Sequence, residues 1–116
     1  MDSLAEAVVA IATPQHAGRI DGLLTRGRHD KAEQRLSKAG WWRPERVEDV
    51  SNHAAEALRE SASGDVVWSL GRSGWRELAL DDAADRIVDG YFALFVTADG
   101  TVLFAPEGTA RYRSLR

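Results

Sequence analysis

The chain has 116 residues and a formal net charge of −3, and 44% of its residues are hydrophobic and 28% are charged. This composition is typical of a globular protein and too apolar for a disordered one, so we expect a single domain over residues 1–116. Without a cysteine, a signal peptide or an apolar run near the ~20 residues that span a bilayer, it is expected to be cytoplasmic, with no membrane contact.

Four helices are predicted in the N-terminal half, where apolar residues recur at helical spacing. They are expected from Ser3 to Thr13, from Pro14 to Gly27, from Asp30 to Gly40 and over residues 44–62. Pro14 and Pro44 suit the first turn of a helix, because the missing N–H has no partner there in any case. Gly27 and Gly40 suit helix ends, where the chain often adopts a positive φ.

Beyond residue 63 the apolar period changes from helical to alternating, which indicates strands. The expected elements are a hairpin with strands over 66–70 and 75–80, a short helix over 82–89, and a second hairpin with strands over 91–97 and 101–105. An Asp-Gly turn joins the second pair, and its first strand is apolar on both faces and therefore central. The polar tail after Pro106 is expected to fray. The predicted fold class is α+β, a helical half packed on a small antiparallel sheet of two hairpins.

Basic residues are concentrated between Arg19 and Arg46, where eight Lys/Arg stand against four acids and leave a local charge of +4. Four of these cations recur at intervals of three, four and three, namely Arg28, Lys31, Arg35 and Lys38. This spacing places them in one narrow sector of a helix, which we call the basic stripe. Such a helix can neutralise phosphates along a nucleic-acid backbone. The predicted nucleic-acid-binding residues are Arg28, Lys31, Arg35, Lys38, Arg43 and Arg46. A solvated flank, with basic stems covering the edge of the core, is the alternative.

Trp41 and Trp42 are adjacent and cannot both point inward from one helical turn. We therefore predict that at least one of them lines a surface groove or a partner interface, or stacks on a base. The alternative is that both rings are buried in the core.

The C-terminal third resembles a known module. Thr97-Ala98-Asp99-Gly100-Thr101-Val102-Leu103-Phe104-Ala105-Pro106, followed by Ala110-Arg111-Tyr112, resembles the C-terminal wing of bacterial winged-helix proteins. It is similar to the closing segment of winged-helix subunits in bacterial condensin-like plasmid-defence systems, over residues 82–113. The resemblance implies scaffolding or DNA contact without catalysis. With a helix-turn-helix-like stretch at 28–62 and a wing at 91–106, it favours a winged-helix variant, in which Arg111 and Arg113 add phosphate contacts.

Other chemistry has little support in the sequence. His16, His29 and His53 lie 13 and 24 residues apart and no cysteine can complete a metal site, so we expect no metal and no cofactor. Asp82 and Asp85 share a face of the short helix with Asp89, and this pattern predicts a solvated acidic face, with a divalent-metal or acid–base site as the alternative. No motif of nucleophilic catalysis is present.

The sequence therefore predicts a non-enzymatic module that binds nucleic acid or sits in a nucleoprotein assembly. The alternative is a protein–protein adaptor, inhibitor or immunity-type partner, or a homodimer, which uses the acidic faces at 45–60 and 81–89 or an exposed tryptophan. A small enzyme would need a pocket that joins the aspartates of the short helix to a histidine.

Overall fold

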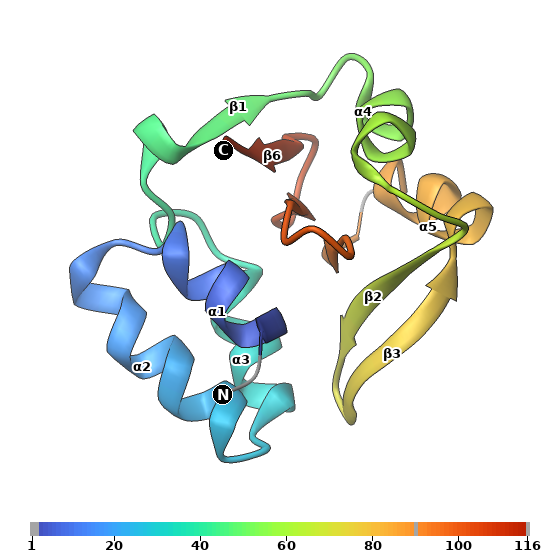
Figure 1. Ribbon diagram of the computed structural model, residues 1–116. Coiled ribbons are helices and arrows are strands. Elements are labelled where there is room, and N and C mark those ends of the chain that lie inside the picture. Colours follow the sequence, from blue (N-terminus) through green and yellow to red (C-terminus); the bar gives the residue numbers. More distant parts are fainter. Residues whose placement is uncertain (1–2, 90, 116) are drawn as a thin grey trace.

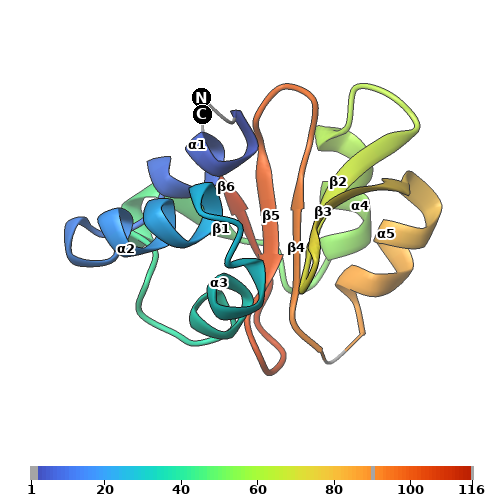
Figure 2. The same ribbon diagram turned by 90° about the horizontal axis from the view of Figure 1, so that it is seen from below.

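The computed structural model describes residues 3–89 and 91–115, in which helices cover both faces of a six-stranded antiparallel sheet (Figures 1 and 2). The helices are α1 (Ser3–Ala10), α2 (Pro14–Thr25), α3 (His29–Leu36), α4 (Ala54–Ser61) and α5 (Leu80–Ile87), with one 3-10 turn, η1 (Pro44–Arg46). The strands are β1 (Val47–Asp49), β2 (Val66–Gly71), β3 (Gly74–Ala79), β4 (Ala93–Val96), β5 (Val102–Ala105) and β6 (Tyr112–Ser114). Their order in the sheet is β1-β6-β5-β4-β2-β3, which confirms the α+β class.

The sheet separates two apolar cores, because side chains alternate across it. Leu94 and Phe104 point to the core under α1, α2 and α3, whereas Phe95 and Leu103 point to the core under α4 and α5. Figure 2 shows these two helical layers on either side of β4 and β5. Every residue of β4 and of β5 is buried. This confirms the central position predicted for the first of the two strands. Among the described residues, none of the helices has the length and apolar character that crossing a bilayer requires.

The long helix predicted over residues 44–62 is wrong, and so is the helix-turn-helix-like stretch at 28–62 that depended on it. The chain makes one 3-10 turn, then the strand β1, and α4 begins only at Ala54. β1 exists because a distant strand pairs with it: Val47 lies opposite Ser114, and Glu48 opposite Arg113. The carboxylate of Asp49 then accepts a hydrogen bond from the backbone N–H of Ser51 at 2.8 Å, which turns the chain toward α4.

The prediction that the sheet consists of two hairpins alone is also wrong. β2 pairs with β4 and joins both hairpins in one sheet, but β1 and β6 extend it to six strands. The β4–β5 hairpin lies between β2 and β6, so it does not project from the body as a wing. The tail that was expected to fray supplies β6, which pairs with β5 and with β1. Its Arg111 is only 4% exposed.

Arg111 holds the tail to the end of α5 through its guanidinium group. It donates to the carbonyl oxygens of Gly108 and Ala110 at 2.9 and 2.8 Å, and to that of Ile87. The substitution Arg111→Met keeps most of the stem but leaves these acceptors without a donor, so we expect it to lower the free energy of unfolding by about 2–4 kcal/mol. Urea denaturation followed by circular dichroism measures this loss. Arg59→Met, at an exposed ion pair, is the control and should cost less than about 1 kcal/mol.

Candidate nucleic-acid interface

A helical hairpin, α2 and α3, carries most of the predicted basic stripe. Gly27, at φ +75°, makes the turn between the two helices, and the backbone N–H of Arg28 donates to the carbonyl of Leu23 at 2.8 Å. Ile20 and Leu36 are fully buried and pack the hairpin against the sheet. The outer surface of the hairpin is therefore free to present polar side chains.

The two ends of this hairpin are held together by backbone pairing. The segment before α2 and the segment after α3 form an antiparallel bridge between Ala12 and Trp42. The N–H of Thr13 donates to the carbonyl of Trp41, and the N–H of Arg43 donates to that of Ile11, both at 2.8 Å. This clamp fixes α2 and α3 relative to each other.

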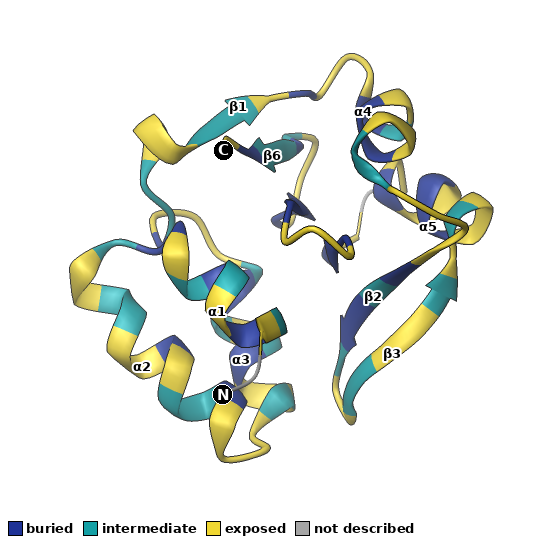
Figure 3. Ribbon diagram, in the orientation of Figure 1, coloured by how far each residue is buried: buried dark blue, intermediate teal, exposed yellow. Residues whose placement is uncertain are grey.

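Two adjoining hollows, of about 310 and 350 Å³, lie along α2 and α3 and share Arg19, Leu23 and Lys31. We call them together the α2–α3 groove. Its lining holds six cations and, among the described residues, no acid. They are Arg19, Arg26, Arg28, Lys31, Arg35 and Lys38. Only two residues of α2 are buried, so this side of the molecule is open to solvent (Figure 3).

None of the six groove cations forms an ion pair with an acid of the described residues. The ion pairs among the described residues join Arg59 to Asp81, Arg72 to Glu33, and Arg113 to Glu48 and Glu60. None of them involves a groove residue. Gly18 and Gly22 line one of the two hollows, and a Cβ at either position would meet no atom within 4 Å, so the groove is open there. The arrangement can hold a chain of anionic groups.

Comparisons of the chain with models of protein families, with curated proteins and with solved structures found no match. The resemblance of residues 82–113 to winged-helix subunits therefore rests on the sequence motif itself.

The structure brings four of the six predicted cations together and places two elsewhere. Arg28, Lys31, Arg35 and Lys38 line the groove. Arg43 lies outside it, half-buried, and its Nε donates to the carbonyl of Ala12 at 3.0 Å. Arg46 is exposed at the end of η1, also outside the groove. Phosphate contact by these two remains a prediction from the sequence.

The cations suggested on the wing side have structural partners. Arg111 is buried, as described above. Burial opposes the charge of Arg113, but hydrogen bonds and charge contacts with Glu48 and Glu60 outweigh it and raise the pKa of the guanidinium group. Arg113 is therefore engaged inside the molecule, where it bridges β1 and α4.

The rings of Trp41 and Trp42 contact each other and Phe104 of the sheet. Trp41 is 1% exposed, and its Nε1 donates to the carbonyl of Leu36 at 3.0 Å, which ties it to the end of α3. Trp42 is half-buried, with ring centroids 5.2 Å from Phe104 and 5.0 Å from Tyr112. Trp41 is thus a core residue, and of the two only Trp42 keeps part of its ring at the surface.

Sequence reasoning did not assign Arg19 and Arg26 to the site, although both line the groove. They lie seven residues apart, two turns of α2, so helical spacing places them on one face. That spacing was a usable signal, but only the hairpin shows that their face adjoins the basic stripe of α3.

The acidic residues gather on the opposite side of the sheet. α4 and α5 together carry five acids and two bases, whereas residues 14–38 carry six bases and three acids. Among the described residues, no group of three or more His, Asp and Glu could hold a metal ion. The charge asymmetry of the sequence is therefore an asymmetry between two faces, with the α2–α3 groove on the basic face.

Proposed function

We propose that this protein is a non-enzymatic nucleic-acid-binding module and that the α2–α3 groove holds the phosphate backbone. The observation that carries the proposal is the lining of the groove, six cations with no acidic partner among the described residues. Lys/Arg that neutralise phosphates release condensed counterions, which makes binding favourable and salt-dependent.

The proposed docking element is a helix-turn-helix of α2 and α3. Support comes from the short turn at Gly27 and from the backbone clamp between Ala12 and Trp42, which hold both helices as one unit. The proposal keeps only the helical part of a winged-helix relationship, formed by α1, α2 and α3, because the β4–β5 hairpin lies within the sheet and is no wing. Its third helix presents Lys31 and Arg35 to solvent on the side away from the core.

The test is the affinity for a 20-base-pair duplex DNA with 5′-hydroxyl ends, measured by fluorescence anisotropy over a salt series. If all six cations contact phosphates, log K should fall against log salt with a slope of about −5. A flat response, or no binding at micromolar protein, contradicts the proposal. A stable complex with a protein and no salt-dependent DNA binding would favour the adaptor alternative.

The substitution Lys31→Gln should reduce that slope by about one, because it removes one phosphate contact. Lys31 is exposed and lines both halves of the groove, so the change should leave the fold intact. Arg59→Gln, which removes one charge from the opposite layer, should leave the slope unchanged. An equal change of slope in both variants would point to net charge rather than to the groove.

A further inference from the structure

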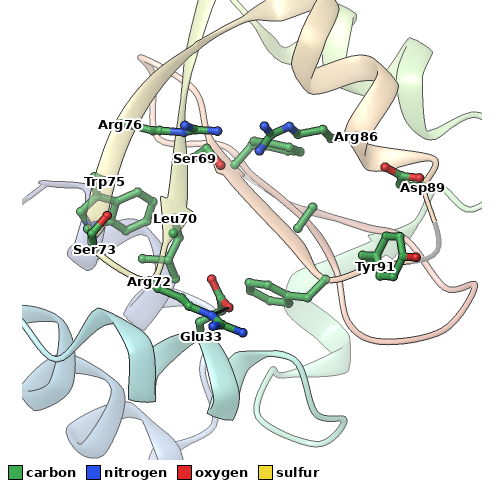
Figure 4. A pocket seen from close by; sticks show the side chains of 15 residues that line it. Glu33, Ser69, Leu70, Arg72, Ser73, Trp75, Arg76, Arg86, Asp89 and Tyr91 are labelled. Atoms are coloured by element: carbon green, nitrogen blue, oxygen red, sulfur yellow. Dashed lines mark ion pairs between the residues drawn. The ribbon is translucent and has the colours of Figure 1, made fainter.

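A second site lies where β2 separates from β4. These strands pair only at Trp68 with Val96 and at Ser69 with Phe95, although β2 continues to Gly71 alongside β3. A cavity of about 590 Å³ opens at this fork, between the β2–β3 hairpin, the start of β4 and the end of α5 (Figure 4). We call it the fork cavity.

One end of the fork cavity suits an oxyanion. Arg76 lies opposite Ser69 in the sheet register, and Arg86 comes from α5. Figure 4 shows both guanidinium groups reaching toward each other above Ser69. No ion pair of the described residues involves Arg76 or Arg86, whereas Arg72, in the same cavity, lies 3.7 Å from Glu33. The cavity lining also includes the acids Asp89 and Glu33, but neither forms an ion pair with Arg76 or Arg86. The two guanidinium groups repel each other, and an anion between them lowers that cost.

The hydroxyl of Ser69 adds a further donor at this end. Ser69 is 7% exposed and lines the cavity, and no hydrogen bond of the described residues involves its hydroxyl. Its oxygen is not among the buried polar atoms that lack a partner, so it remains accessible from the cavity and can donate to a ligand there. Arg76, Arg86 and Ser69 thus place donors from two strands and a helix at the same end of the cavity (Figure 4).

The other end is aromatic. Tyr91 is 78% exposed at the mouth of the cavity, and Phe92 and Trp75 contribute to its wall. An exposed ring beside a cavity gives a platform on which a planar base can stack. The buried Nε1 of Trp75 has no hydrogen-bond partner among the described residues, so this wall carries an unsatisfied donor. Such donors are rare in proteins.

We propose that the fork cavity binds a nucleoside 5′-phosphate, either free or at the end of a nucleic-acid strand. The phosphate lies between Arg76 and Arg86 and accepts from Ser69, and the base stacks on Tyr91. Arginine favours phosphate because its planar fork donates two parallel hydrogen bonds. The inference does not rest on the function proposed for the α2–α3 groove, since no groove cation lines this cavity.

Calorimetric titration of the full chain with adenosine 5′-monophosphate tests the proposal. We expect measurable binding, with adenosine and inorganic phosphate each weaker. The variant R76Q/R86Q should lose about 10- to 100-fold in affinity, the effect of hydrogen bonds to charged groups. Y91A should weaken the nucleotide but not inorganic phosphate. R59Q, with one charge removed outside the cavity, is the control and should bind like the unaltered chain.

A single-stranded oligonucleotide with a 5′-phosphate, compared with its 5′-hydroxyl form, separates the two sources of the ligand. Binding of the free nucleotide supports a small-molecule site, and binding of the phosphorylated strand alone supports an end-binding site. The proposal is overturned if neither binds at millimolar ligand, or if R76Q/R86Q, folded by circular dichroism, binds as tightly as the unaltered chain. The groove variant K31E/R35E should keep nucleotide binding, so failure at one site is distinguishable from failure at the other.

Discussion

The double substitution K31E/R35E is expected to weaken binding to duplex DNA by roughly 100- to 1000-fold at low salt. It removes two cations from the α2–α3 groove and sets two carboxylates against the phosphates. In high-dielectric surroundings each charge contact at about 4 Å is worth near 1 kcal/mol, and four unit changes act in the same direction. Neither side chain makes an ion pair among the described residues, so the fold should lose little. Fluorescence anisotropy at fixed low salt measures the effect.

The matched control is R76E/R86E, which changes the net charge by the same four units in the fork cavity. Both double variants are therefore also compared at about 0.15 M salt, where charges more than about 8 Å apart are largely screened. With a duplex that has 5′-hydroxyl ends, we expect R76E/R86E to bind there within about threefold of the unaltered chain. Equal losses in both double variants would show that the overall charge drives binding, and the groove would then not be the interface. The two double variants have the same net charge, so a difference between their affinities reports where the charges lie.

The sequence predicted the elements whose partners lie nearby along the chain. The Asp-Gly turn and the doubly apolar run identified β4 and β5, because adjacent strands and a two-residue turn are local information. It failed over residues 44–62, where apolar spacing fits a helix. β1 forms because Glu48 lies opposite Arg113, 65 residues away, and periodicity does not record such pairing.

The part of the candidate site that follows from local spacing was also predictable from the sequence. The stripe from Arg28 to Lys38 needed only the helical period, and the structure keeps it although both residues lie just beyond the ends of α3. The place of Arg26 in the groove could be recognised only from the α2–α3 hairpin. The fork cavity could be recognised only from the short pairing of β2 with β4. Arg111 shows the opposite error. The sequence motif suggested that this residue lies on an exposed wing, whereas the structure buries it.

Trp41→Ala is expected to lower the free energy of unfolding by about 3–5 kcal/mol, near the upper range for large-to-small core changes. The indole is 1% exposed, its ring centroid lies 5.0 Å from that of Phe104, and its N–H donates to the carbonyl of Leu36. The substitution therefore leaves a cavity between α3 and β5 and an unpaired carbonyl at the end of α3. Because domains of this size are stable by only about 5–15 kcal/mol, a substantial unfolded fraction is expected. Urea denaturation at 222 nm measures the loss.

Trp42→Ala separates a structural role from a binding role at the adjacent position. Trp42 is half-buried, and it contacts Phe104 and Tyr112 from the rim of the same cluster, so we expect a loss of only about 1–2 kcal/mol. If Trp42 serves a partner, W42A should weaken that complex while the domain stays folded. A loss of stability in W42A equal to that in W41A would contradict the distinction, since both rings would then support the clamp to the same degree. Trp41→Phe keeps most of the ring volume, so it isolates the lost Leu36 hydrogen bond at about 1 kcal/mol.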